Sequence, residues 1–144
     1  MPEKETLERA RRDKREGKAA STQAGEFVRE EIEHIREGKH GARSTKQAIA
    51  IGLSKARRAG VDLPPSKGSS EETKEQAERD IRKAHTGAKK SAKRSRATRK
   101  ALKKEGRSAA SKEALSTQAR KAARKRSAAS RSRSAKKAAA TRKK

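Results

Sequence analysis

The chain is 144 residues long, carries a formal net charge of +25 and contains no cysteine. Leu, Ile, Val and Phe together make up about 9% of it, and such a low apolar content at high charge is typical of disordered proteins. The absence of cysteine excludes disulfides and thiolate metal sites. The sequence shows neither an apolar run of membrane-spanning length nor a secretory leader, so we expect a cytoplasmic protein without a membrane span.

Residues 1–20 predict a charged N-terminal helix. Few of its side chains are apolar, so little of its surface can be buried. Glu5 and Glu8 each stand four residues before an arginine, which is a favourable ion-pair spacing on a helix.

Residues 21–65 predict a helical hairpin, because nine of the 13 large apolar residues of the chain lie there. The first helix of the hairpin is expected to use Ser21 or Thr22 as its N-cap and to end before Gly38. Its apolar residues recur at helical spacing and form one stripe. The stripe consists of Ala24, Phe27, Val28, Ile32 and Ile35.

The second helix of the hairpin has a clear predicted start and end. Ser44 and Gln47 match the S-x-x-Q capping box, in which Gln47 reaches back to the N–H of Ser44. Gly60 is suited to the left-handed position after the last turn, and Pro64 with Pro65 prevents the helix from continuing.

Six apolar residues of the hairpin are predicted to form its core or a face that binds a partner. A two-helix unit of this size is small for independent stability. We therefore expect that a second copy of the chain, forming a homodimer, or another protein covers part of this surface. The six residues are Phe27, Val28, Ile32, Ile35, Ile49 and Leu53.

Residues 66–85 predict a linker followed by a polar helix. Ser69 and Glu72 match a capping box at the start of this helix. Ile81 is its only large apolar residue, so it offers little to a core.

Residues 86–144 hold 23 Lys and Arg against two Glu, which accounts for +21 of the net charge. With so few apolar side chains this segment cannot offset its ordering entropy, so we expect a largely disordered tail. Basic clusters separated by small residues predict contacts to nucleic-acid phosphates. We expect these contacts from Lys89, Lys90, Lys93, Arg94, Arg96, Arg99, Lys100, Lys103, Lys104, Arg120, Lys121, Arg124, Lys125, Arg126, Arg131, Arg133, Lys136 and Lys137.

The predicted binding is independent of base sequence. Phe27 is the only aromatic residue, so the chain offers no platform for stacking on single-stranded bases. No motif supplies a recognition helix for reading base edges. Charge neutralisation of a polyanion remains, and we favour DNA over RNA as the partner.

No motif indicates an enzyme, a cofactor or a metal site. The sequence lacks a nucleophile elbow, a phosphate-binding loop and a zinc-protease motif. His34 and His40 lie near Glu30, Glu31 and Glu37, but their spacing fits no zinc pattern. Histidines among acids on a polar helix face are usually solvated, so we predict no metal ligands.

Two parts of the chain resemble known proteins. The stretch Ser44–Gly60, STKQAIAIGLSKARRAG, resembles the core of a family of small basic bacterial proteins of unknown function, and the tail from Gly106 to Arg126 is similar to tails of that family. This resemblance implies no activity. The Lys/Ala/Ser composition of the tail also resembles the C-terminal domains of linker histones and bacterial histone-like proteins, which implies DNA compaction and, in a bacterium, association with the nucleoid.

The sequence thus predicts an all-α protein with a short helical hairpin, flanking charged helices and a long, largely disordered basic tail. The predicted function is sequence-independent binding of nucleic acid through the tail. One alternative is a protein-interaction module that uses the 21–65 hairpin, with the tail as a solubility or localisation element. Another is an RNA- or ribosome-associated protein.

Overall fold

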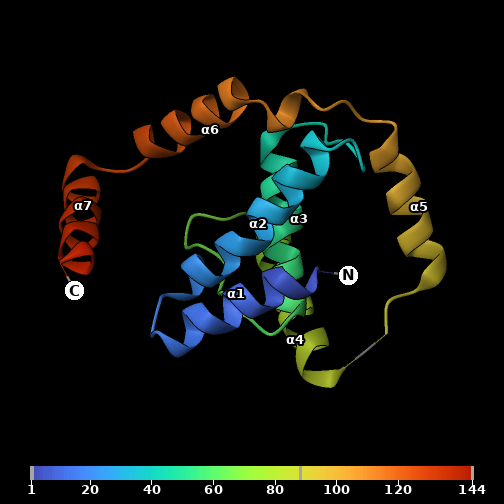
Figure 1. Cartoon of the computed structure of the whole chain (residues 1–144), viewed down its shortest axis with the longest axis horizontal. Coiled ribbons are helices and arrows are strands. Elements are labelled where there is room, and N and C mark those ends of the chain that lie inside the picture. Colours follow the sequence, from blue (N-terminus) through green and yellow to red (C-terminus); the bar gives the residue numbers. More distant parts are fainter. Residues whose placement is uncertain (1, 88, 144) are drawn as a thin grey trace.

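The protein is all-α in the computed structural model, which describes residues 2–87 and 89–143. The helices fall into two groups, a bundle and an arc around it (Figure 1). The bundle contains α1 (Lys4–Arg15), α2 (Ala20–Arg36), α3 (Thr45–Arg58) and α4 (Glu71–Thr86), and the arc contains α5 (Ala92–Lys103), the 3₁₀ turn η1 (Ser108–Ala110), α6 (Lys112–Arg124) and α7 (Ala128–Arg142).

The α2–α3 pair is the centre of the bundle. Its two helices approach closely where Gly52 of α3 faces Val28 of α2: a Cβ added to the glycine would lie 2.6 Å from the Cα of Val28. Phe27 and Ile35 of α2 are completely buried, as are three alanines of the pair. Small residues on both helices let the backbones approach, and the few large apolar side chains fill the remaining space.

The ends of these two helices follow local rules, with two exceptions. The Ser44 hydroxyl accepts from the Gln47 N–H at 3.1 Å, which confirms the predicted N-cap of α3. The Gln47 side chain, however, accepts from the N–H of Arg43 at 2.7 Å, so the predicted return bond to Ser44 is wrong. The predicted cap of α2 at Ser21 or Thr22 is also wrong, because the helix already begins at Ala20.

Two glycines end these helices as predicted. Gly38 has φ +79° and Gly60 has φ +97°, a left-handed conformation that costs a glycine little. After Gly60 the Val61 N–H donates to the carbonyl of Ala56 at 3.0 Å, and the valine side chain turns back into the core.

The outer helices α1 and α4 cover opposite parts of the α2–α3 pair. Leu7 and Ala10 of α1 pack on the cluster around Phe27. The polar helix α4 packs on α3 through Ala77 and through Asp80, which is fully buried. The Asp80 carboxylate accepts from Ser54 and from Arg58 at 2.6 and 2.9 Å. This helix is capped by Ser70 rather than by the predicted Ser69.

The predicted disorder of the tail is wrong, since α5, η1, α6 and α7 occupy most of residues 92–142. Ala, Lys and Arg favour helix, and a serine hydroxyl caps the start of each long helix. These caps are Ser91, Ser111 and Ser127. The three helices bury no residue, so they form through local helix preference and capping and not through burial of apolar surface.

Among the described residues of this region, the 3₁₀ turn is the part that enters the core. Ala109 and Ala110 are buried in a second cluster with Ile35, Ala42 and Ala48. The C-terminal arc is therefore attached to the bundle through its middle.

None of the helices within residues 2–87 and 89–143 combines the length and the apolar content needed to cross a membrane.

Replacing Gly52 by alanine should destabilise the protein, because the added methyl group would overlap the backbone of Val28. We expect a loss of about 1–3 kcal/mol in the free energy of unfolding. Gly25 in α2 is the matched control, since a Cβ at that position would have no atom within 4 Å. Gly25→Ala should stabilise the protein by about 0.5–1 kcal/mol. Urea unfolding measures both changes, and shifts of the same sign would contradict the close approach of α2 and α3.

Candidate nucleic-acid interface

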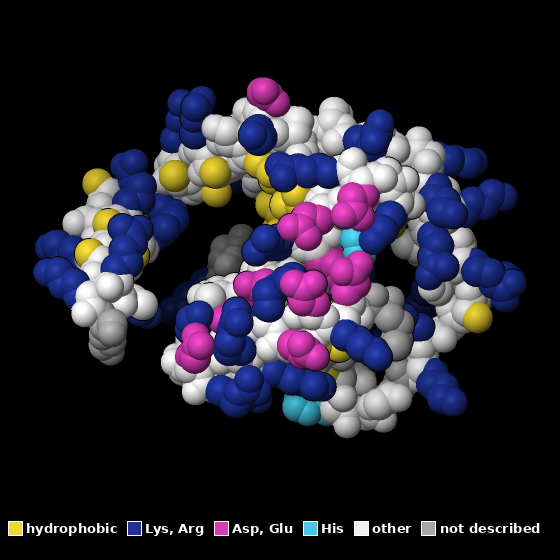
Figure 2. Space-filling model, in the orientation of Figure 1, with side chains coloured by type: hydrophobic (Ala, Val, Ile, Leu, Met, Phe, Trp, Pro, Cys, Tyr) yellow, Lys and Arg dark blue, Asp and Glu magenta, His cyan; other side chains and the backbone are white. Residues whose placement is uncertain are grey.

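The predicted phosphate-binding residues lie on the arc and on the short segment before it. All 18 have exposed side chains. Figure 2 shows Lys and Arg side chains over much of α5 and α7, whereas Asp and Glu gather over the bundle. The structure does not bring these cations to one point but distributes them along three helices. Lys93 to Lys103 lie on α5, Arg120 to Arg124 on α6, and Arg131 to Lys137 on α7.

The basic residues of the bundle and of the arc differ in their ion pairing. In the bundle, Arg9 pairs with Glu26, Lys18 with Asp13, and Arg58 with Asp80. Over residues 89–143, as far as the structure describes them, no Lys or Arg forms a salt bridge. The positive charge of the arc is therefore available to an external anion.

Backbone hydrogen bonds attach the arc to the loop between α2 and α3. The Gly41 N–H donates to the Leu102 carbonyl at 2.9 Å, and the Ala42 N–H donates to the Gly106 carbonyl at 3.1 Å. The buried hydroxyl of Thr45 donates to the Ala109 carbonyl at 2.6 Å. These bonds hold the end of α5 and the turn before α6 against the bundle.

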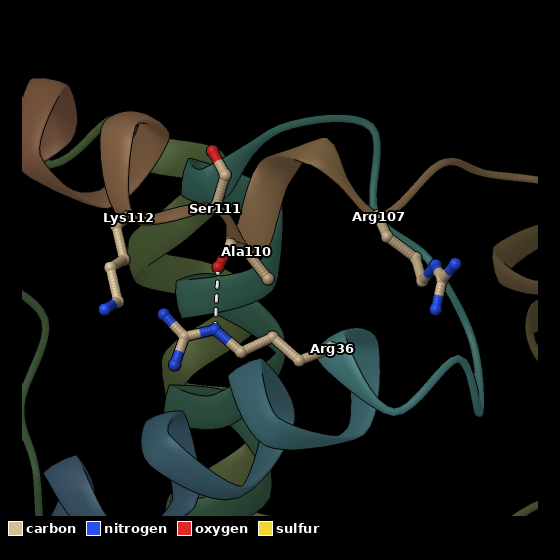
Figure 3. A pocket seen from close by; sticks show the side chains of 5 residues that line it. All are labelled: Arg36, Arg107, Ala110, Ser111 and Lys112. Carbon is tan, nitrogen blue, oxygen red and sulfur yellow. Dashed lines mark hydrogen bonds between the residues drawn. The ribbon is translucent and has the colours of Figure 1, made fainter.

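A basic pocket of about 390 Å³ lies at this junction. Arg36, Arg107 and Lys112 line it together with Ala110 and Ser111, and Figure 3 shows the Arg36 guanidinium on the same side of the turn as the Lys112 side chain. Arg36 Nε donates to the Ala110 carbonyl at 2.9 Å, which holds the guanidinium at the pocket. The Arg107 guanidinium points away from the other two cations (Figure 3), so Arg36, Lys112 and the N-terminus of α6 are the groups that would favour an anion here.

Sequence reasoning missed these three cations as site residues. Arg36 belongs to α2, more than 70 positions before the other lining residues, and no local signal connects it with them. Arg107 and Lys112 flank the 3₁₀ turn and stand outside the dense basic clusters.

Positive charge also accumulates where the chain enters the arc. Lys90 has an exposed side chain, yet surrounding protein atoms and the charges of Arg58 and Lys55 lower the pKa of its ammonium. Lys90 therefore lies close to Arg58 and Lys55 of α3, whose own charges pair with Asp80 and Glu31.

The six apolar residues predicted for the hairpin are buried to different degrees. Phe27 and Ile35 are inaccessible to solvent. The other four are partly buried: Leu53 packs on the Phe27 cluster and Ile32 on the Ile35 cluster, with Val28 and Ile49 also half-covered.

The structure gathers the histidines and acids that the sequence left as solvated side chains. Glu31, His34 and His40 place one ligand atom each within 4.8 Å of one another, and Glu3, Glu30 and His34 form a second such group. The tertiary fold brings His40 from the loop back to α2, which sequence spacing could not show.

Residues 4–67 match the model of a family of unknown function, DUF6496. The matched segment contains α1, α2 and α3 and ends before α4. Neither a search of the curated proteins nor a search of the solved structures found a match to the chain.

Replacing Gly41 by alanine should detach the arc from the bundle. Its added Cβ would lie 2.0 Å from the Glu105 carbonyl oxygen, so the hydrogen bonds to Leu102 and Gly106 could not both persist. We expect faster exchange of the backbone amides at position 41 and at Ala42. Gly68→Ala is the control, because nothing lies within 4 Å of a Cβ at that position. Unchanged exchange in Gly41→Ala would contradict this attachment.

Proposed function

We propose that this protein binds duplex nucleic acid, with DNA favoured over RNA, without reading base sequence, and that α5, α6 and α7 carry the binding. The observation that supports this most directly is the difference in ion pairing between the two parts of the chain. The bundle neutralises many of its own cations, whereas residues 89–143 contain 22 Lys and Arg, none of them in a salt bridge in the described structure, and only two Glu.

Counterion release would provide the binding energy. Each Lys or Arg that contacts a phosphate releases condensed cations from the duplex, which contributes about 0.9 to the slope of log K against log salt concentration. The arc presents its cations on helices with small residues between them, so the backbone can come close to the phosphates.

The distribution of these cations favours contact with the backbone over contact with bases. They cover three separate exposed helices instead of converging on one helix that could fill a major groove. The pocket beside Arg36 and Lys112 adds an anion-binding point in the middle of the arc. With one aromatic residue, itself buried, the chain has no stacking surface for single strands.

Neutralising part of the arc should weaken binding and reduce its salt dependence. We expect the substitution of four basic residues of α7 by glutamine to reduce the slope by about 3.6, if each makes one phosphate contact. The measurement is fluorescence anisotropy with a duplex at several salt concentrations. The four residues are Arg131, Arg133, Lys136 and Lys137.

Four exposed basic residues of α1 provide a control with the same change in net charge. Their replacement by glutamine should change the slope by less than about 0.9, the value of one phosphate contact, because they lie on the bundle. If both quadruple variants lose the same affinity, net charge alone governs binding and the arc is not the interface. The control residues are Arg11, Arg12, Lys14 and Arg15.

Two duplexes of equal length and unrelated sequence should compete equally for the protein. We expect their affinities to agree within about threefold, far below the roughly thousandfold or greater ratio of specific binding. A single strand with the same number of phosphates should compete less well, since its charge density is lower and no stacking compensates. A strong preference for one duplex, or for duplex RNA, would overturn the proposal in its present form.

A further inference from the structure

A buried group of acids and histidines lies at the C-terminal end of α2 and in the loop that follows it, beside the point where the arc joins the bundle. Glu30, Glu31 and His34 project from α2, and His40 comes from the loop that follows it. The side chains of Glu30 and Glu31 are 2% and 1% exposed, and those of the two histidines are 14% exposed. Carboxylates are rarely buried to this degree unless cations neutralise them.

Hydrogen bonds turn one nitrogen of each imidazole toward Glu31. His34 Nε2 lies 2.9 Å from a Glu3 carboxylate oxygen, and His40 Nδ1 lies 2.9 Å from the Gly41 carbonyl. Both partners can only accept, so these two nitrogens carry the protons. The remaining nitrogens, Nδ1 of His34 and Nε2 of His40, lie 3.9 and 3.1 Å from the two oxygens of Glu31.

This arrangement requires positive charge between Glu31 and the two imidazole nitrogens that face it, here called the inner nitrogens. In neutral histidines the inner nitrogens present lone pairs, which repel the carboxylate oxygens unless a cation lies between them. Lys55 contacts one oxygen of Glu31, but no ammonium stands between the other oxygen and His40. Either protons on the imidazoles or a metal ion would resolve the repulsion.

We propose that Glu31, His34 and His40 bind one divalent transition-metal ion of the zinc class. The oxygen-to-nitrogen separation of 3.1 Å between Glu31 and His40 is close to the roughly 3.3 Å between neighbouring ligands of a tetrahedral ion with bonds of about 2.0 Å. The longer His34 separation of 3.9 Å requires a small side-chain movement. Two imidazoles and one carboxylate suit Zn²⁺ and disfavour Mg²⁺ and Ca²⁺, which take oxygen ligands.

The surroundings of the three ligands also match a metal site. Metal-binding histidines usually donate their outer N–H to a carboxylate or a backbone carbonyl, as His34 does to Glu3 and His40 to Gly41. An independent observation is Glu30, whose Oε1 lies 3.8 Å from His34 Nε2 and whose buried Oε2 has no hydrogen-bond partner. Oε1 of Glu30 accepts from the Glu3 N–H at 2.8 Å, and a dication held by His34 would offset the negative charge that remains on this carboxylate.

Lys55 is the cation that a metal must displace. Its ammonium already neutralises Glu31, so the metal and the lysine compete for the same carboxylate. Removal of this ammonium by Lys55→Met should therefore raise metal affinity, whereas loss of a ligand should lower it.

The decisive experiment titrates the full chain with Zn²⁺ at neutral pH and follows binding by calorimetry and by the imidazole ¹⁵N resonances. We expect one equivalent to bind, with the resonances of His34 and His40 shifting together while those of His85 stay unchanged. His85 is the third and last histidine of the chain and is exposed near the end of α4. The resonance test needs no substitution in the site, so it holds even if a variant fails to fold.

Variants give the quantitative test. His40→Ala should lower Zn²⁺ affinity by at least about tenfold, while His85→Ala leaves it unchanged and Lys55→Met increases it. Circular dichroism checks that each variant keeps its helices. No saturable binding to the native chain, or equal resonance shifts at all three histidines, would show that the imidazoles are merely protonated partners of the acids and would overturn the metal site.

Discussion

The close approach of α2 and α3 is the constraint on which the rest of the structure depends. The chain has few large apolar residues, and among the residues that the structure describes eight of the eleven buried apolar ones are alanines. Small side chains bury useful area only when backbones come close, so Gly52 against Val28 sets the spacing of the core. The same spacing brings Lys55 of α3 to Glu31 of α2 and positions the loop that holds His40.

A second close backbone approach joins the two parts of the molecule. At Gly41 the α2–α3 loop meets the residues after α5. Carbonyl groups of the arc accept hydrogen bonds from the backbone of this loop, at a place where the arc has almost no apolar surface. Ala109 and Ala110 add the small buried contact that the arc provides. The chain has too few apolar residues to cover both parts. It therefore divides into a bundle that pairs its charges and an arc that exposes them.

The two proposed sites use charge in opposite ways. The arc keeps its cations in solvent, where water stabilises them and an external polyanion can reach them. The cluster at the end of α2 buries carboxylates, where each needs a compensating cation because the surroundings are less polar than water. The first site depends on composition and tolerates rearrangement, whereas the second depends on the positions of three side chains.

The sequence by itself determined the all-α class, the cap at Ser44 and the left-handed ends at Gly38 and Gly60, because these depend on residues within a few positions of one another. Tertiary structure alone decided that Asp80 packs on α3, that Arg36 bonds the Ala110 carbonyl, and that His40 returns to Glu31. These contacts join residues that no periodicity relates. The helices of the arc lie between the two cases: their helix propensity and serine caps are present in the sequence, although they bury almost no surface.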